Sequence, residues 1–154
     1  MARNFRFRPR YRGIAWTAVG IGGTLGTIAV VSLGAALLPL ATGAAGLVLG
    51  AGYLMSPTWK LEVVVDEAGL EVRSPRARRF RITWDEVVRV VSSPTTHTCF
   101  VDGGAPERSL LVPGDGAPAP YDIEDRPALC EAILAQVAAD KVTTVDTLHA
   151  ARAG

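Results

Sequence analysis

One stretch limits what this chain can fold into more than any other. The forty-two residues from Ile14 to Met55 contain no Asp, Glu, Lys, Arg or His. A helix crosses a ~30 Å hydrocarbon core with ~20 residues, and in lipid its backbone amides must be paired internally. The length therefore predicts two transmembrane helices, roughly 14–31 and 36–55, joined by a turn within 32–39.

Two positions suit that turn. Ser32-Leu33-Gly34 contains turn-prone residues, whereas Pro39 suits the first position of a second helix, where its missing N–H costs little. A cleaved signal peptide is the rival interpretation, with its cleavage site at 32–34. The apolar core is longer than the ~7–15 residues of a signal peptide, and a second apolar stretch follows, so a retained hairpin is favoured.

Glycines recur through the apolar block with a spacing that lets helix backbones approach closely. Gly22 and Gly26 form one small-xxx-small pair, and Gly46 and Gly50 form another. Either the two spans pack on each other, or these faces dimerise. Internal packing is favoured, because the partner helix is already tethered alongside.

Charge gives the expected orientation. The leader, residues 1–13, contains no acid and carries five arginines, namely Arg3, Arg6, Arg8, Arg10 and Arg12. The positive-inside bias places such a leader in the cytoplasm, and an even number of spans returns the chain to the same side. Aromatic residues that suit the membrane interface flank the block: Tyr11, Trp16, Tyr53 and Trp59. We expect a multi-pass protein of the bacterial inner membrane with both termini cytoplasmic.

The segment after Met55 is acidic, with fifteen acids and eleven bases. Nucleic-acid binding needs many phosphate neutralisations, so this balance argues against it. Alternating apolar residues predict strands at 61–65, 70–73, 79–82, 87–91, 98–101 and 109–112. A helical stripe of Leu129, Ile133 and Val137 predicts a helix at about 125–140, and 141–154 is expected to be a loose tail. The fold class is therefore α+β: a transmembrane hairpin, then a small antiparallel β-barrel or sandwich at 57–140 with one C-terminal helix.

This order of elements resembles the bacterial membrane-anchored pleckstrin-homology-like proteins. The resemblance rests on the strand–turn–strand from Leu61 to Val72, with Gly69 in the turn, and on the stretch Phe80–Val87 with Trp84-Asp85-Glu86 after a basic strand. It implies a small β-barrel closed by a C-terminal helix and held at the membrane as a cytosolic platform.

No pattern in the sequence indicates catalysis, a metal site or a cofactor. His97 and Cys99 lack further ligands at suitable spacing, and a structural zinc takes four. Asp85 and Glu86 are adjacent and point apart, so a turn capped by Thr83 and Glu86 is the simpler interpretation. Cys99 and Cys130 are expected to be reduced, buried thiols. The chain is not expected to be an enzyme.

A basic cluster on the second strand hairpin is the remaining feature. It comprises Arg73, Arg76, Arg78, Arg79 and Arg81. Near an anionic inner leaflet, each basic residue contributes ~1 kcal/mol of attraction to lipid headgroups. Alternatively, the arginines pair with Glu62, Glu67 and Glu71 across the hairpin.

These features favour a non-enzymatic, membrane-tethered module that binds or scaffolds a protein partner, a second copy of itself or lipid. The alternative is an accessory subunit of a membrane complex that works through its glycine-rich spans.

Overall fold

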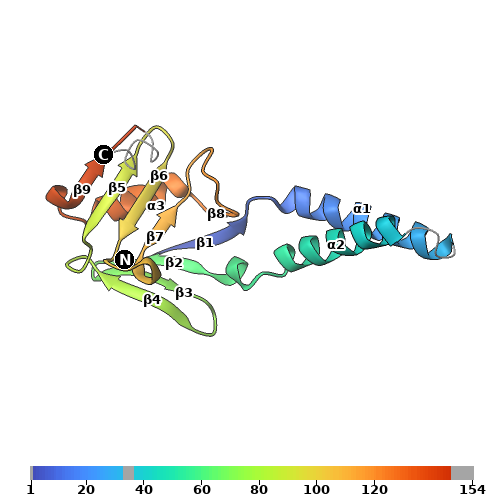
Figure 1. The fold of residues 1–154 in the computed structure, drawn as a ribbon. Coiled ribbons are helices and arrows are strands. Elements are labelled where there is room, and N and C mark those ends of the chain that lie inside the picture. Colours follow the sequence, from blue (N-terminus) through green and yellow to red (C-terminus); the bar gives the residue numbers. More distant parts are fainter. Residues whose placement is uncertain (1, 33–36, 147–154) are drawn as a thin grey trace. The chain divides into compact units, whose positions relative to one another are not determined.

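The computed structural model describes residues 2–32 and 37–146 (Figure 1). The chain forms two compact units, Met1–Arg8 with Lys60–Gly154, and Pro9–Trp59. The chain thus begins in the first unit, leaves it to form the second, and then returns. We call these the β domain and the helical hairpin.

The helical hairpin consists of α1 (Arg12–Val31) and α2 (Leu37–Leu54), followed by a short 3-10 helix, η1 (Pro57–Lys60). Both long helices are apolar and long enough to cross a membrane, as the sequence predicts. Pro39 lies in the first turn of α2, where no backbone hydrogen bond is lost. Half of the expected turn range, residues 33–36, lies outside the described residues, and α2 already begins at Leu37.

The first sheet of the β domain has the order β4-β3-β2-β1-β8. Its strands are β1 (Arg3–Pro9), β2 (Glu62–Val65), β3 (Gly69–Arg73), β4 (Arg78–Thr83) and β8 (Tyr121–Ile123). Phe5 in β1 lies opposite Val63, which lies opposite Val72 in β3. These side chains face the core, because alternate residues of a strand share one face.

The second sheet has the order β7-β6-β5-β9. Its strands are β5 (Arg89–Ser93), β6 (Thr98–Asp102), β7 (Leu110–Val112) and β9 (Val142–Thr144), and the 3-10 helix η2 (Pro106–Arg108) lies between β6 and β7 in the chain. β9 runs parallel to β5, whereas the other pairs are antiparallel.

A helix, α3 (Arg126–Leu134), packs against β2 of one sheet and β6 of the other. Leu129 and Ile133 are fully buried in the core that the sheets share. Val137 also enters this core, although it follows the helix. A last 3-10 turn, η3 (Ala139–Lys141), leads into β9.

The structure corrects the expected fold in several places. The strands form two sheets, and within the described residues no ladder closes them into a barrel. Residues 3–9 of the leader form a strand. The C-terminal helix ends at Leu134, and part of the expected tail forms β9, while 147–154 lie outside the described residues. The α+β class with a C-terminal helix is confirmed.

Candidate functional site

Four glycines occupy the contact between α1 and α2. A Cβ atom on Gly22 would lie 2.7 Å from the Gly43 carbonyl oxygen, and one on Gly43 would lie 2.8 Å from the Gly22 oxygen. A Cβ on Gly46 would lie 3.0 Å from the Ala18 carbonyl oxygen, and one on Gly50 would lie 2.9 Å from the Ala15 carbonyl oxygen. Only glycine permits this approach of two backbones.

The other expected packing glycine has a different role. A Cβ on Gly26 would meet nothing within 4 Å, but its backbone nitrogen lies 2.9 Å from the Cβ position of Gly43. Gly43 was not among the expected packing residues, because its partner on the same helix at four-residue spacing is Leu47. Its contact depends on the facing helix, which sequence spacing does not reveal.

Aromatic side chains gather at the end of the hairpin where α1 begins and α2 ends. The Tyr53 hydroxyl accepts a hydrogen bond of 2.9 Å from the Tyr11 backbone N–H, which joins the two helix ends. The Trp59 indole donates to the Tyr53 carbonyl, and the two rings meet edge to face at 4.9 Å.

The leader arginines have two kinds of position. Arg10 precedes α1 and Arg12 is its first residue, whereas Arg3, Arg6 and Arg8 belong to β1. Arg6 lies opposite Glu62, and Arg8 pairs with Glu124 beside β8. Three of the five therefore take part in the β domain, a role that the sequence analysis missed. The signal was the alternation of Phe5 and Phe7 with polar residues.

Three arginines of the basic cluster pair with carboxylates of the same sheet. Arg73 lies 2.6 Å from Glu62, and both Arg78 and Arg81 lie near Glu71, at 3.3 and 3.6 Å. Asp66 also lies 3.5 Å from Arg81. Exposed pairs of this kind contribute only ~0–1 kcal/mol each, but they neutralise much of the cluster.

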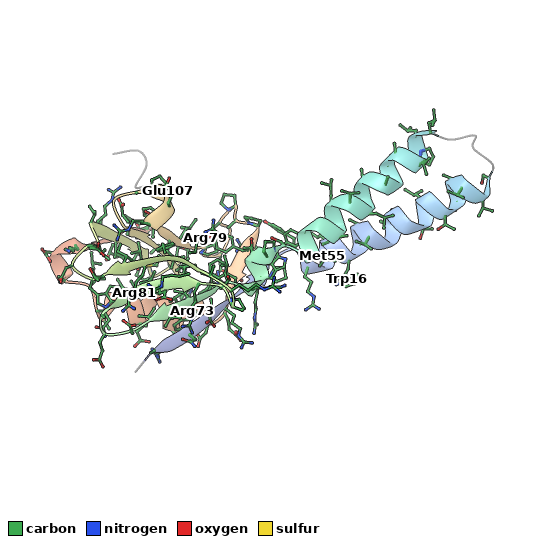
Figure 2. All side chains as sticks on the ribbon, turned by 90° about the horizontal axis from the view of Figure 1, so that it is seen from below. Trp16, Met55, Arg73, Arg79, Arg81 and Glu107 are labelled. Carbon is green, nitrogen blue, oxygen red and sulfur yellow. The ribbon has the colours of Figure 1, made fainter. Side chains whose placement is uncertain are left out.

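Arg76 and Arg79 form no ion pair with the described residues. A register shift in the β3–β4 ladder pairs Val72 with Phe80 and Arg73 with Arg78, so Arg79 has no residue opposite it in the ladder. Burial raises the pKa of Tyr121, and the nearby Arg79 opposes that rise. Figure 2 shows Arg73, Arg79 and Arg81 on the β domain, whose surface is rich in polar atoms, in contrast to the nearly all-carbon side chains of the hairpin.

The turn after β4 is closed as its sequence suggests. The Glu86 carboxylate accepts hydrogen bonds from the Thr83 backbone N–H at 2.9 Å and from the Thr83 hydroxyl at 3.1 Å. Arg108 of η2 donates to the same carboxylate at 2.9 Å. These donors, led by the Thr83 N–H, lower the pKa of Glu86 to about 2. The backbone carbonyl of the adjacent Asp85 accepts a hydrogen bond of 3.0 Å from the Lys141 side chain.

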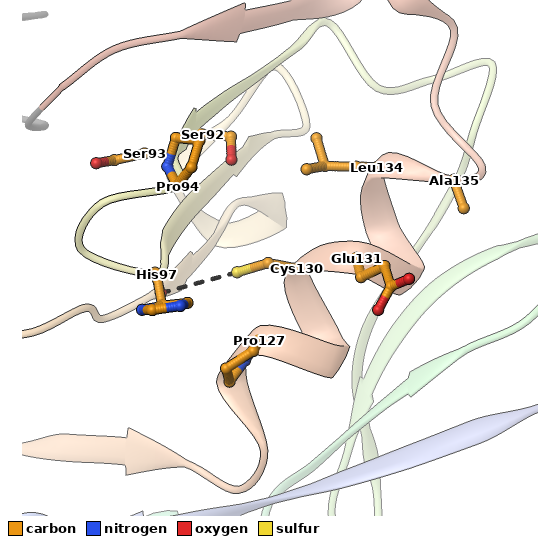
Figure 3. Close-up of a pocket in the computed structure, with 9 residues that line it drawn as sticks. All are labelled: Ser92, Ser93, Pro94, His97, Pro127, Cys130, Glu131, Leu134 and Ala135. Carbon is orange, nitrogen blue, oxygen red and sulfur yellow. Dashed lines mark hydrogen bonds between the residues drawn. The ribbon is translucent and has the colours of Figure 1, made fainter.

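A surface cavity of about 530 Å³ opens between α3 and the β5–β6 turn (Figure 3). Its lining includes Ser92, His97, Cys130, Glu131 and Leu134. His97 has a positive φ of 51°, which is uncommon for a residue other than glycine. The Cys130 thiol points toward the His97 carbonyl oxygen at 3.8 Å.

The two cysteines are neighbours in the core, although thirty residues separate them in the sequence. The neighbouring Cys130 thiol, together with burial, raises the pKa of Cys99. The same contact lowers the pKa of Cys130, against burial and with help from Arg126. Both are free thiols. No group of three or more potential ligands is placed to hold a metal ion in the described part of the chain.

Comparisons with protein-family models, curated proteins and solved structures gave no match.

Proposed function

We propose that this chain is a non-enzymatic, membrane-tethered binding or scaffolding module. In this proposal, α1 and α2 cross the bilayer and the β domain stands on the cytoplasmic side. The observation that carries it is the position of the hairpin in the chain: it is inserted between β1 and β2, which are neighbours in one sheet.

The surface of the hairpin supports the membrane location. Less than a fifth of each apolar helix is buried, whereas the core helix of a soluble domain is mostly buried. Large apolar side chains such as Val31, Leu38 and Leu49 are between 73% and 80% exposed. Soluble monomers rarely expose contiguous apolar surface on this scale, whereas lipid accommodates it without cost.

Strand pairing supports an even number of crossings. Arg3–Arg6 of β1 pair residue by residue with Glu62–Val65 of β2. Hydrogen bonds across a sheet require both strands in one compartment, so both ends of the apolar block emerge on the same side. The arginines before α1 favour the cytoplasm for that side.

The same pairing argues against a cleaved signal peptide. Cleavage near 32–34 would remove β1, which lies between β2 and β8. The buried Phe5 and Phe7 would leave the core with it. Retention of the leader is therefore a condition for the fold.

Two consecutive strand meanders, β2–β4 and β5–β7, with α3 packed on both sheets, support kinship with the pleckstrin-homology-like proteins. The sheets are open at their edges rather than closed. Binding to lipid headgroups through the basic cluster falls mainly to Arg76 and Arg79, since the other three arginines are paired.

Topology is tested with single cysteines introduced at exposed positions, in a chain whose buried Cys99 and Cys130 are both replaced by serine so that only the introduced thiol is labelled. Ser32→Cys lies at the end of α1, and Ala68→Cys lies in the β2–β3 turn; both positions are exposed. In intact cells, a membrane-impermeant maleimide should label the first and reach the second only after lysis. Labelling of Ala68→Cys in intact cells would invert the orientation, and release of the uncleaved chain by alkaline carbonate would refute insertion.

One observation on the glycines of α1 supports the alternative, an accessory subunit of a membrane complex. Gly20 and Gly23 of α1 face open space, and a Cβ at either would meet nothing within 4 Å. Gly20→Leu should leave the hairpin intact and remove any co-purifying membrane partner if that alternative holds. Unchanged co-purification favours the tethered module.

A further inference from the structure

The β5–β6 ladder and α3 bring the only two cysteines of the chain together. Cys99 of β6 lies directly opposite Ser92 of β5, so the two side chains share one face of the sheet. Ser92 lines the cavity together with Cys130 of α3, which packs against β6. Cys99 therefore lies beneath the cavity floor, and Cys130 lies at its wall.

The two thiols differ in access. Cys99 is fully buried, whereas Cys130 keeps 8% of its surface exposed and faces a cavity wide enough for small solutes. A solute that enters the cavity meets the Cys130 sulfur before that of Cys99. Figure 3 shows the Cys130 thiol directed toward the His97 carbonyl.

The charge around Cys130 suits a reactive thiol. Arg126 lies four residues earlier on α3 and is fixed by Asp115 at 2.9 Å, Asp122 at 3.2 Å and the Pro113 carbonyl at 3.0 Å. The Cys99 thiol and the positive charge of Arg126 both lower the pKa of Cys130 and so favour its thiolate. The negative charge of Glu131, on the cavity wall, is exposed to solvent, which screens it. The thiolate is the form that reacts with oxidants.

We propose that Cys130 is a peroxide-sensitive thiol and that Cys99 is its resolving partner, so that oxidation links α3 to β6 through a disulfide. The juxtaposition of the two thiols beneath one cavity carries this proposal. It is independent of membrane insertion, but a cytoplasmic location would keep the pair reduced at rest and make its oxidation a signal.

The chemistry balances with hydrogen peroxide as the oxidant. The Cys130 thiolate attacks one peroxide oxygen, the O–O bond breaks, and with one proton the products are a sulfenic acid and water. The Cys99 sulfur then attacks the Cys130 sulfur, the S–O bond breaks, and the thiol proton leaves with hydroxide as a second water. Two thiols are oxidised and one peroxide is reduced.

The test uses the reduced full-length chain in detergent micelles, treated with hydrogen peroxide and then denatured and alkylated. We expect wild type to lose two hydrogen atoms by intact mass and to lose both alkylatable thiols without forming a dimer. In Cys99→Ser, Cys130 should stop at the sulfenic acid and be trapped by dimedone. In Cys130→Ser, Cys99 should remain a thiol.

A measurement on wild type alone guards against misfolded variants. Brief maleimide labelling of the folded chain followed by peptide mapping should find Cys130 modified before Cys99, and unfolding in urea should abolish the difference. The proposal is overturned if peroxide yields only intermolecular disulfides, if Cys130 is oxidised without consuming Cys99, or if neither thiol reacts at a dose that oxidises free cysteine.

Discussion

The burial of Phe5 tests whether the arginine-rich leader belongs to the β domain. Phe5 is 6% exposed, and its ring lies on the core side of β1, opposite the fully buried Val63. Phe5→Ala removes the ring and leaves a cavity in the core. Such substitutions cost about 3–5 kcal/mol, a large part of the ~5–15 kcal/mol that stabilises a typical domain.

The neighbouring Arg6→Ala is the matched control. Arg6 belongs to the same strand but is exposed, and it faces Glu62, whose carboxylate is held by Arg73 at 2.6 Å. Its removal keeps the backbone pairing of β1 and leaves no cavity. The free energy of unfolding should therefore change by only about 0.5 kcal/mol.

Urea unfolding of the full-length chain in detergent gives the measurement. Trp84 packs against the core and its indole donates to the Asp66 carbonyl at 3.0 Å, so its emission reports on the β domain. Trp16 and Trp59 belong to the hairpin unit and are replaced by Phe in every variant. With a slope of about 1–2 kcal/mol per molar urea, Phe5→Ala should lower the midpoint by roughly 1.5–5 M.

Equal midpoints for Phe5→Ala and Arg6→Ala would refute the reasoning. The leader would then act only as a topology signal, and β1 would contribute nothing to the core. A variant that is already unfolded without urea agrees with the expected loss, provided that Arg6→Ala stays folded.

The remaining predictions concern the hairpin, the β4 turn and the basic cluster. Gly22→Ala should move α1 and α2 apart, because its Cβ would lie 2.7 Å from the Gly43 oxygen, whereas Gly20→Ala meets nothing; overpacking of this kind costs about 1–3 kcal/mol. With spin labels attached at Ile21→Cys and Val48→Cys, the distance between the labels should lengthen in Gly22→Ala but not in Gly20→Ala. Equal distances in the two variants would contradict the close helix contact at Gly22. Glu86 has its pKa lowered to about 2 in the folded chain, so its contribution is full above its unfolded pKa and is lost as the pH falls from about 4.5 to 2. The protection of the Thr83 amide, measured as its exchange rate relative to the intrinsic rate at each pH, should fall across that range, and in Glu86→Gln this loss of protection should disappear. Arg76→Ser with Arg79→Ser should reduce quenching of Trp84 by headgroup-labelled anionic vesicles containing the full-length chain, whereas Arg89→Ser, which removes the partner of Asp102, should not; equal quenching in all three proteins would exclude headgroup contact by the cluster.

The sequence predicted those elements whose signal is local. The apolar residues around Leu61–Val65 and Leu70–Arg73 give β2 and β3 nearly to the residue, because they are bounded by the Asp66–Gly69 turn and their valines and Leu70 are buried. The forty-two uncharged residues likewise predict both long helices. The Thr83–Glu86 pair predicted its turn, since both partners lie within four residues.

The missed elements depend on partners far away in the sequence. β8 has three residues, and its neighbour β1 lies at the opposite end of the chain. β9 is a short β-branched run that becomes a strand only beside β5, where Thr143 lies opposite Val91. The proximity of Cys99 and Cys130 could not be predicted for the same reason, because it arises only when α3 packs on β6.

The strand order explains why the described strands form two separate sheets rather than a closed barrel. Placing β1 beside β2 leaves β4 and β8 as the edges of the first sheet. At the β4 edge, Arg108 of η2 donates to the Arg81 carbonyl at 3.5 Å, so a short helix rather than a strand approaches it. The expected domain at 57–140 lacked β1, and with it the residues that set this order.

The hairpin and the sheet stabilise each other through chain entropy. Pairing Phe5 with Val63 closes a loop of more than fifty residues, and closing a long flexible loop costs entropy that grows with its length. Once α1 and α2 have packed, the Tyr11 N–H and the Tyr53 hydroxyl are hydrogen-bonded at 2.9 Å. Only the few residues that join each helix to its strand then remain flexible. The packed helical hairpin therefore lowers the entropy cost of pairing β1 with β2, as a tight turn would. Substitutions that separate the helices should therefore weaken the β1–β2 pairing, although they touch no residue of the β domain.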